Sequence, residues 1–204
     1  MKKPIIEGLF PTPVYRRKLD RKFTEQELNL VEKTKTKCMK NYYNKNSADS
    51  YILNHPSFST LKKEMDLCTQ DYFTKVLVAP QTVSPYITQS WLNYTEMGQS
   101  HHAHSHENSC VSGVLYINAD IMHDEITFKH GRYNQIKIPT TKWNPFNSYT
   151  WFFPVETGDL IMFPSHLTHL VTPKKGNNTR ISLSFNVFVK GDLGSKNNLT
   201  ELKL

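Results

Sequence analysis

The feature that most constrains the fold is the alternation of apolar and polar residues in RISLSFNVFVK, residues 180–190. Successive side chains of a strand point to opposite faces, so this alternation predicts a strand with one continuous apolar face. That face would consist of Ile181, Leu183, Phe185, Val187 and Val189. The opposite face would consist of Arg180, Ser182, Ser184 and Asn186. Such a polar face either meets solvent or lines a polar pocket.

Further strand patterns follow one another from Tyr86 onward, separated by turn residues at 97–98, 157–159 and 175–178. The expected strands are 86–96, 101–106, 110–119, 125–129, 135–138, 149–154, 159–163, 167–172 and 180–190. Many short strands at this spacing are typical of a sandwich or barrel.

The part of the chain before residue 80 carries helical patterns instead. Thr24 followed by Glu27 fits a capping box, and the helix that it opens is expected to run to about Tyr42. Its inward residues would be Leu28, Val31 and Cys38. A second helix is expected over residues 57–77, because apolar residues recur there at helical spacing. These residues are Leu61, Met65, Cys68, Tyr72 and Val76.

The length and the change of pattern near residue 85 favour a single domain over residues 1–204. A helical support at about 20–80 would precede a β core at about 85–190. Residues 191–204 are expected to be a frayed tail.

Charge and cysteine usage exclude several classes of protein. The net charge is +7, but the lysines and arginines are scattered and no nucleic-acid-binding motif accompanies them, so no nucleic-acid partner is expected. The three cysteines are far apart and lack a C-x-x-C pair, which is typical of a reducing compartment. No segment has the apolar run of a signal peptide or a membrane span, so a cytoplasmic protein without a membrane partner is expected. The sequence leaves the oligomeric state open.

Histidines gather in GQSHHAHSHENSCVSG, residues 98–113, which contains His101, His102, His104 and His106. Neutral imidazole is the commonest metal ligand, and residues two apart on a strand share a face. Either His104 with His106 or His102 with His104 can therefore hold one metal ion. A third ligand must come from elsewhere, and His169 in the segment PSHLTH is the leading candidate.

Arg180 begins the last strand eleven residues after His169, and Ser182 shares its face. A buried arginine needs an anionic partner, and its planar fork matches a carboxylate. The chain thus offers a metal site and, beyond it, a carboxylate receptor. A redox iron enzyme that uses a diacid cosubstrate needs this pair of sites, with metal positions left open for O2.

Taken together, these motifs resemble the Fe(II)/2-oxoglutarate-dependent oxygenases. The chain is most similar to a small subgroup found in marine bacteria and their phages, which would place a phage-encoded member in the host cytoplasm. The matching segments are LFPTPVY (Leu9–Tyr15), SWLNY (Ser90–Tyr94), H-x-H followed by SGVLYIN (His104–Asn118), GDLIMFPS-x-L-x-H-x-V-x-P (Gly158–Pro173) and RISLSFN (Arg180–Asn186). The resemblance implies a mainly β, cupin-like double-stranded β-helix (jelly roll) with N-terminal helices packed on one sheet.

The resemblance also implies the cofactors and the residues that hold them. His104, His106 and His169 would be the catalytic Fe(II) ligands, and Arg180 and Ser182 would bind the cosubstrate 2-oxoglutarate. Asn93 lies at the offset of a 2-oxoglutarate contact in the nucleic-acid demethylase branch. The enzyme would use O2 to hydroxylate an unidentified substrate, a protein side chain or a small molecule, with release of succinate and CO2.

The chain departs from the family at His106, where the usual metal triad has a carboxylate. Three arrangements remain open: three histidines, recruitment of Glu107, or ligation by His102 and His104. Two other functions also stay open. One is a cupin-type metalloenzyme that does not use 2-oxoglutarate, although the cupin glutamate is missing after the H-x-H segment. The other is a non-catalytic jelly-roll binding module.

Overall fold

The computed structural model describes residues 3–41, 43–131, 136 and 138–204. Its helices are α1 (Glu25–Lys35) and α2 (Ser59–Lys75), with 3-10 turns at Ile52–Asn54 and Pro56–Phe58. Its strands are β1 (Tyr15–Lys18), β2 (Met39–Lys40), β3 (Lys45–Asn46), β4 (Val83–Thr95), β5 (His101–His104), β6 (Val111–Asn118), β7 (Glu125–Lys129), β8 (Thr150–Pro154), β9 (Asp159–Pro164), β10 (His169–Val171), β11 (Arg180–Leu193) and β12 (Leu202–Lys203). The predicted mainly β fold is confirmed.

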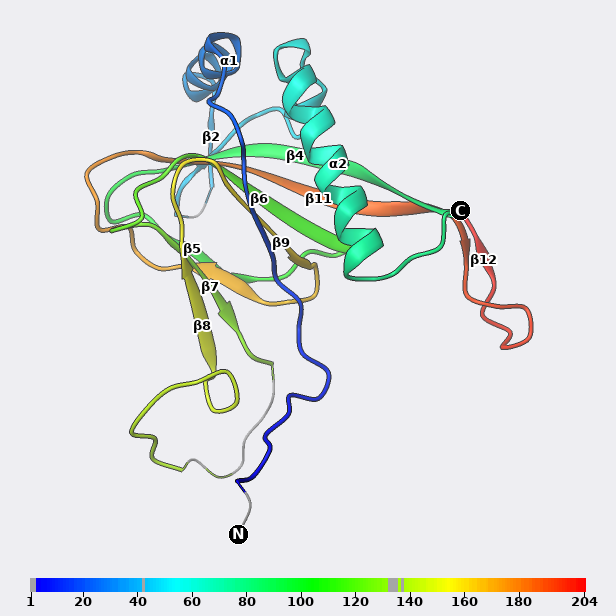
Figure 1. Ribbon diagram of the computed structural model, residues 1–204. Coiled ribbons are helices and arrows are strands. Elements are labelled where there is room, and N and C mark those ends of the chain that lie inside the picture. Colours follow the sequence, from blue (N-terminus) through cyan, green and yellow to red (C-terminus); the bar gives the residue numbers. More distant parts are fainter. Residues whose placement is uncertain (1–2, 42, 132–135, 137) are drawn as a thin grey trace.

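The strands form two sheets that face each other (Figure 1). The larger sheet has the order β1-β9-β6-β11-β4-β3-β2, with β12 paired to β11, and the smaller has the order β5-β10-β7-β8. Neighbouring strands within each sheet are antiparallel. Side chains from both sheets line one internal cavity. This is the predicted double-stranded β-helix, with the cavity between its two layers.

The N-terminal helices pack on the outer face of the larger sheet, as predicted (Figure 1). Leu61, Met65 and Tyr72 of α2 join Leu183 and Phe185 of β11 in one buried apolar cluster. Arg180 and Ser182, on the other face of β11, line the cavity between the sheets. The alternation in β11 therefore separates an apolar layer under the helices from a polar cavity wall. The polar face of this strand lines a pocket and does not face bulk solvent.

The capping box of α1 is present: the Glu27 amide donates to Thr24 Oγ1, and the Thr24 amide donates to Glu27 Oε2. The predicted end of this helix was wrong. Helix α1 ends at Lys35 because Met39–Lys40 pairs with Lys45–Asn46, and this hairpin adds to β4 at the edge of the larger sheet. Leu28 was also misplaced, since its side chain is exposed while Leu30 is buried in the core.

The end of the chain is more ordered than predicted. Strand β11 continues to Leu193, and β12 folds back to pair with it at Asp192 and Leu193, so residues 191–204 are not a frayed tail. The strand expected at 135–138 falls partly outside the described residues, and Ile136 and Ile138 are not in a strand. Neither α1 nor α2, nor any other helix in the described part of the chain, is long and apolar enough to span a bilayer.

Candidate metal centre

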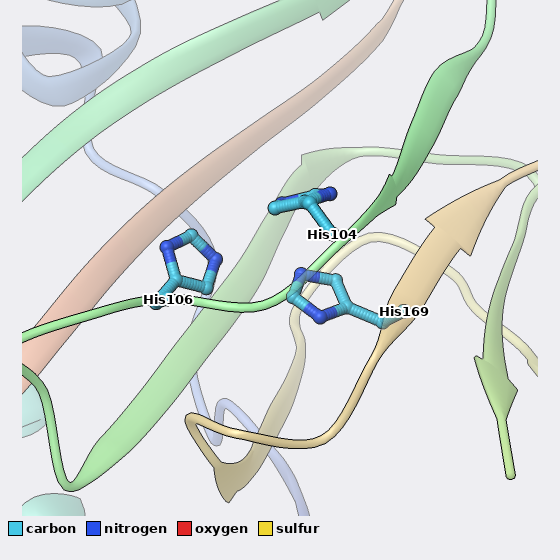
Figure 2. Close-up of side chains that lie close together, drawn as sticks. All are labelled: His104, His106 and His169. Carbon is cyan, nitrogen blue, oxygen red and sulfur yellow. The ribbon is translucent and has the colours of Figure 1, made fainter. Parts of the chain in front are cut away.

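Three histidines meet at the cavity: His104 and His169 from the adjacent strands β5 and β10, and His106 from the segment after β5 (Figure 2). His104 ends β5 and pairs with His169, the first residue of β10. The chain continues from β5 to His106, whose amide donates to the Ser165 carbonyl over 2.9 Å. The candidate ligand atoms of the three side chains all lie within 4.8 Å of one another. Three imidazoles grouped in this way could hold one metal ion.

Hydrogen bonds set the tautomer of two of these rings. His104 Nδ1 lies 2.8 Å from the His102 carbonyl, and His169 Nδ1 lies 3.1 Å from the Leu167 carbonyl. A carbonyl oxygen only accepts, so each Nδ1 carries the proton and donates. Each Nε2 then keeps a lone pair for a metal, and the carbonyl fixes the orientation of the ring.

Burial keeps the three rings neutral. It lowers the pKa of His169 to about 3 and that of His106 to about 4, with smaller contributions from neighbouring histidines. The pKa of His104 is lowered as well, again mainly by burial. A neutral imidazole is the form that binds a metal. The cluster is therefore in the ligating state at physiological pH.

The structure discriminates between the three ligand arrangements that the sequence left open. Glu107 is exposed, and so is His102. Neither belongs to the cluster of close ligand atoms, which among the described residues consists of His104, His106 and His169. The geometry thus favours an all-histidine site, with an imidazole in the place of the usual carboxylate.

Arg180 lies in the same cavity and is 4% exposed. Its Nη2 donates to Thr95 Oγ1 over 3.2 Å, while its Nε is buried without a hydrogen-bond partner. No ion pair joins Arg180 to a carboxylate in the described ranges. A buried guanidinium without a counter-charge is costly, which indicates that the cavity is built to receive an anion.

The segment that carries this geometry is similar to a known protein family. Residues 89–186, which contain the histidines and Arg180, match the family model described as "Putative 2OG-Fe(II) oxygenase". This segment is similar to the 2OG-Fe(II) oxygenases. No curated protein sequence matches it.

Solved oxygenase structures share the fold. HygX from Streptomyces hygroscopicus, solved with nickel, 2-oxoglutarate and hygromycin B, has a TM-score of 0.60 at 12% identity, over 86% of this chain and 82% of HygX. The 2-oxoglutarate-dependent epimerase SnoN of nogalamycin biosynthesis gives 0.61 at 9%, over 87% and 78%. A prolyl-4-hydroxylase from Pseudomonas putida gives 0.54 at 13%, over 86% and 92%. At such identities the likeness shows the fold alone.

The other two residues predicted for the site, Ser182 and Asn93, also line the cavity. Ser182 is buried two residues after Arg180, and Asn93 lies opposite it on β4. The Asn93 Nδ2 donates to Ser184 Oγ over 2.9 Å. Asn93 therefore donates a hydrogen bond to a neighbouring side chain and also lines the cavity. The roles predicted for Asn93 and Ser182 stay predictions.

Asn44 and His101 are polar residues of the cavity that were not predicted as site residues. Asn44, in the turn between β2 and β3, is 5% exposed, and its Oδ1 is buried with no partner among the described residues. No sequence signal marks it, because its place depends on a hairpin that the pattern did not predict. His101 lay inside the histidine cluster, but a regular strand would point it away from His104.

A bulge in β5 explains the position of His101. His104 pairs with His169, and His101 pairs with Val171. The distance between these two pairs is three residues along β5 but only two residues along β10, so β5 contains one extra residue. The extra residue turns His101 to the same face as His104. Their ring centroids lie 4.4 Å apart. The pKa of His101 is lowered to about 3, mainly by burial and then by the nearby charges of His104, His102 and Arg180.

Proposed function

We propose that this chain is an Fe(II)- and 2-oxoglutarate-dependent dioxygenase that hydroxylates a protein side chain or a small molecule. The observation that carries the proposal is the pairing, in one cavity, of a three-histidine cluster with a buried arginine that lacks a counter-charge. A metal site alone would fit a cupin enzyme equally well. A cupin enzyme that uses no dicarboxylate cosubstrate would not explain why the buried Arg180 lacks a counter-charge.

The donor set fits a divalent first-row metal. His104, His106 and His169 would bind through neutral imidazole nitrogens, which suit iron, nickel, copper and zinc alike. The set contributes no negative charge, so the charge of a divalent ion would be compensated by the bound cosubstrate. Three protein ligands leave coordination positions open for a bidentate cosubstrate and for O2.

The polar wall of the cavity fits the other end of 2-oxoglutarate. Arg180 would take the distal carboxylate with its free Nε–H and its remaining guanidinium donors. Ser182, two residues along β11 on the same face, would donate a further hydrogen bond, and Asn93 on β4 would flank the cosubstrate. Because β11 lies in the sheet opposite β5 and β10, the two ends of the cosubstrate would be held by different layers.

With both groups bound, such a site supplies the oxidation of a substrate C–H bond to an alcohol, consuming O2 and converting 2-oxoglutarate to succinate and CO2. The protein would orient the cosubstrate and keep bulk water away. Trp91, Val114, Ile126 and Phe163 supply apolar walls around the polar groups. The cavity is partly open to solvent, and the substrate would approach from that side.

Activity is tested by incubating iron-loaded protein with 2-oxoglutarate and O2 and measuring succinate by NMR. The assay is run without substrate and with panels of prolyl peptides and small metabolites. We expect slow succinate release without substrate and faster release, matched by a hydroxylated product, with the right one. His169→Ala should abolish both. Iron-loaded protein that binds 2-oxoglutarate but never consumes it, with any substrate, would argue against a dioxygenase.

A further inference from the structure

His101 is a half-buried side chain that lines the cavity and lies outside the cluster of close ligand atoms. Its Nε2 is shielded from solvent and has no hydrogen-bond partner among the described residues. Buried polar atoms are almost always paired, so an unpaired one that faces a cavity indicates a missing ligand atom. Arg180 Nε has the same property and lines the same cavity.

The position of His101 separates it from the metal ligands. Its ring lies against that of His104, with 4.4 Å between the centroids, yet His101 is outside the set whose ligand nitrogens all lie within 4.8 Å of one another. The other three histidines supply the three ligand atoms of that cluster. His101 is thus close enough to reach a molecule bound beside the metal, without being placed to bind the metal itself.

The bulge in β5 turns this ring inward. Without the extra residue between His101 and His104, the side chain at 101 would point away from the cavity. Bulges often re-aim a side chain next to an active site. The neighbouring His102 is exposed, whereas His101 is half-buried and its Nε2 is shielded from solvent.

We propose that His101 is a positioning residue for the cosubstrate, its Nε2–H donating a hydrogen bond to a carboxylate oxygen of 2-oxoglutarate. This inference rests on the proposed function. With its proton on Nε2, His101 would join Arg180 Nε as a second unpaired donor in the cavity. A dicarboxylate supplies hydrogen-bond acceptors at both of its ends. His101 on β5 and Arg180 on β11 would then hold the cosubstrate from the two opposing sheets.

Three variants of the iron-loaded protein test the inference. His101→Leu removes the donor at similar size, His101→Gln restores an amide donor, and His102→Leu is the matched control on the exposed face. Binding of 2-oxoglutarate is measured by anaerobic titration calorimetry, and iron content is measured separately by chelation. A hydrogen bond to a charged group predicts that His101→Leu raises the Kd for 2-oxoglutarate about 10- to 100-fold.

The full pattern has four parts. His101→Gln recovers part of the affinity for 2-oxoglutarate, and His102→Leu binds it like the wild type. All three variants retain stoichiometric iron. In His101→Leu the KM for 2-oxoglutarate rises by a larger factor than kcat falls. An unchanged Kd in His101→Leu would overturn the inference, and so would loss of iron, which would make His101 a metal ligand. Failure of His101→Gln to recover affinity would reduce the role to packing. A wild-type protein that holds iron but does not bind 2-oxoglutarate would remove the proposed function, and this inference with it.

Discussion

Replacing Arg180 with methionine should change stability and ligand binding in opposite directions. Arg180 is 4% exposed, its Nη2 donates a hydrogen bond to the neutral Thr95 hydroxyl, and its Nε has no partner among the described residues. Without ligand, the fold therefore carries a buried positive charge that no carboxylate offsets. Methionine fills a similar space without that charge.

The magnitude follows from the cost of the buried charge. Replacing buried ionic groups by apolar residues of similar volume often stabilises a protein by about 1–4 kcal/mol. In a chain of this size each kcal/mol shifts Tm by about 2–4 °C. The ligand-free Arg180→Met variant should thus melt several degrees above the wild type. With 2-oxoglutarate at a hundred times its Kd, the wild type gains about 2.7 kcal/mol, and the variant gains nothing.

The assay is thermal unfolding of metal-loaded protein with and without 2-oxoglutarate, under anaerobic conditions. The account predicts that Arg180→Met is the more stable protein alone and that the ligand removes or reverses the difference. Two results would refute the reasoning. One is a ligand-free variant that melts well below the wild type, which would mean that Arg180 has a stabilising partner. The other is an equal rise of Tm with 2-oxoglutarate in both proteins.

Three further predictions concern the metal set, the sheet and the helical support. His106→Ala should lose stoichiometric iron while His106→Asp retains it, as measured by chelation assay, and full iron in the alanine variant would point to another ligand. Gly113→Ala should lower Tm, since a Cβ there would lie 2.2 Å from the Phe185 ring, and such overpacking costs about 1–3 kcal/mol; an unchanged Tm would show that the ring can move. Burial raises the pKa of Glu27, but hydrogen bonds from Arg21 and Thr24 outweigh it and lower the pKa below 4.5. Its contribution to stability is therefore present above pH 4.5 and lost at lower pH. The free energy of unfolding of the wild type should exceed that of Glu27→Gln at pH 7, by a margin that narrows below pH 4.5 in urea titrations, and a constant margin would contradict this.

Local sequence patterns predicted much of the architecture. Period-two alternation predicted β11 and its two faces. One face of this strand packs in the apolar core and the other lines a polar cavity, so apolar and polar residues alternate along its sequence. The capping box located the start of α1. Its end at Lys35 could not be found, since the two-residue strands β2 and β3 carry no periodicity and form only because β4 offers an open edge. The pairing of β12 with β11 depends equally on long-range contact.

Some residues of the site were also predictable from local patterns, and others depend on long-range contacts. Spacing and residue type brought His104, His106 and His169 into one hypothesis, and the structure places them together. Arg180 was linked to them by the face of the strand on which it lies. His101 and Asn44 required three-dimensional information, because a bulge orients the first and an unpredicted turn carries the second into the cavity. Neither irregularity has a signature in a single sequence.

The central claim is that the histidine cluster and Arg180 together hold a metal and 2-oxoglutarate. The most direct test is anaerobic addition of Fe(II) and 2-oxoglutarate to metal-free protein, followed by visible absorption spectroscopy. The account predicts a weak metal-to-ligand charge-transfer band that requires both additions and is absent in Arg180→Ala. Protein that retains the metal but shows no band would contradict it and favour a cupin-type metalloenzyme without this cosubstrate.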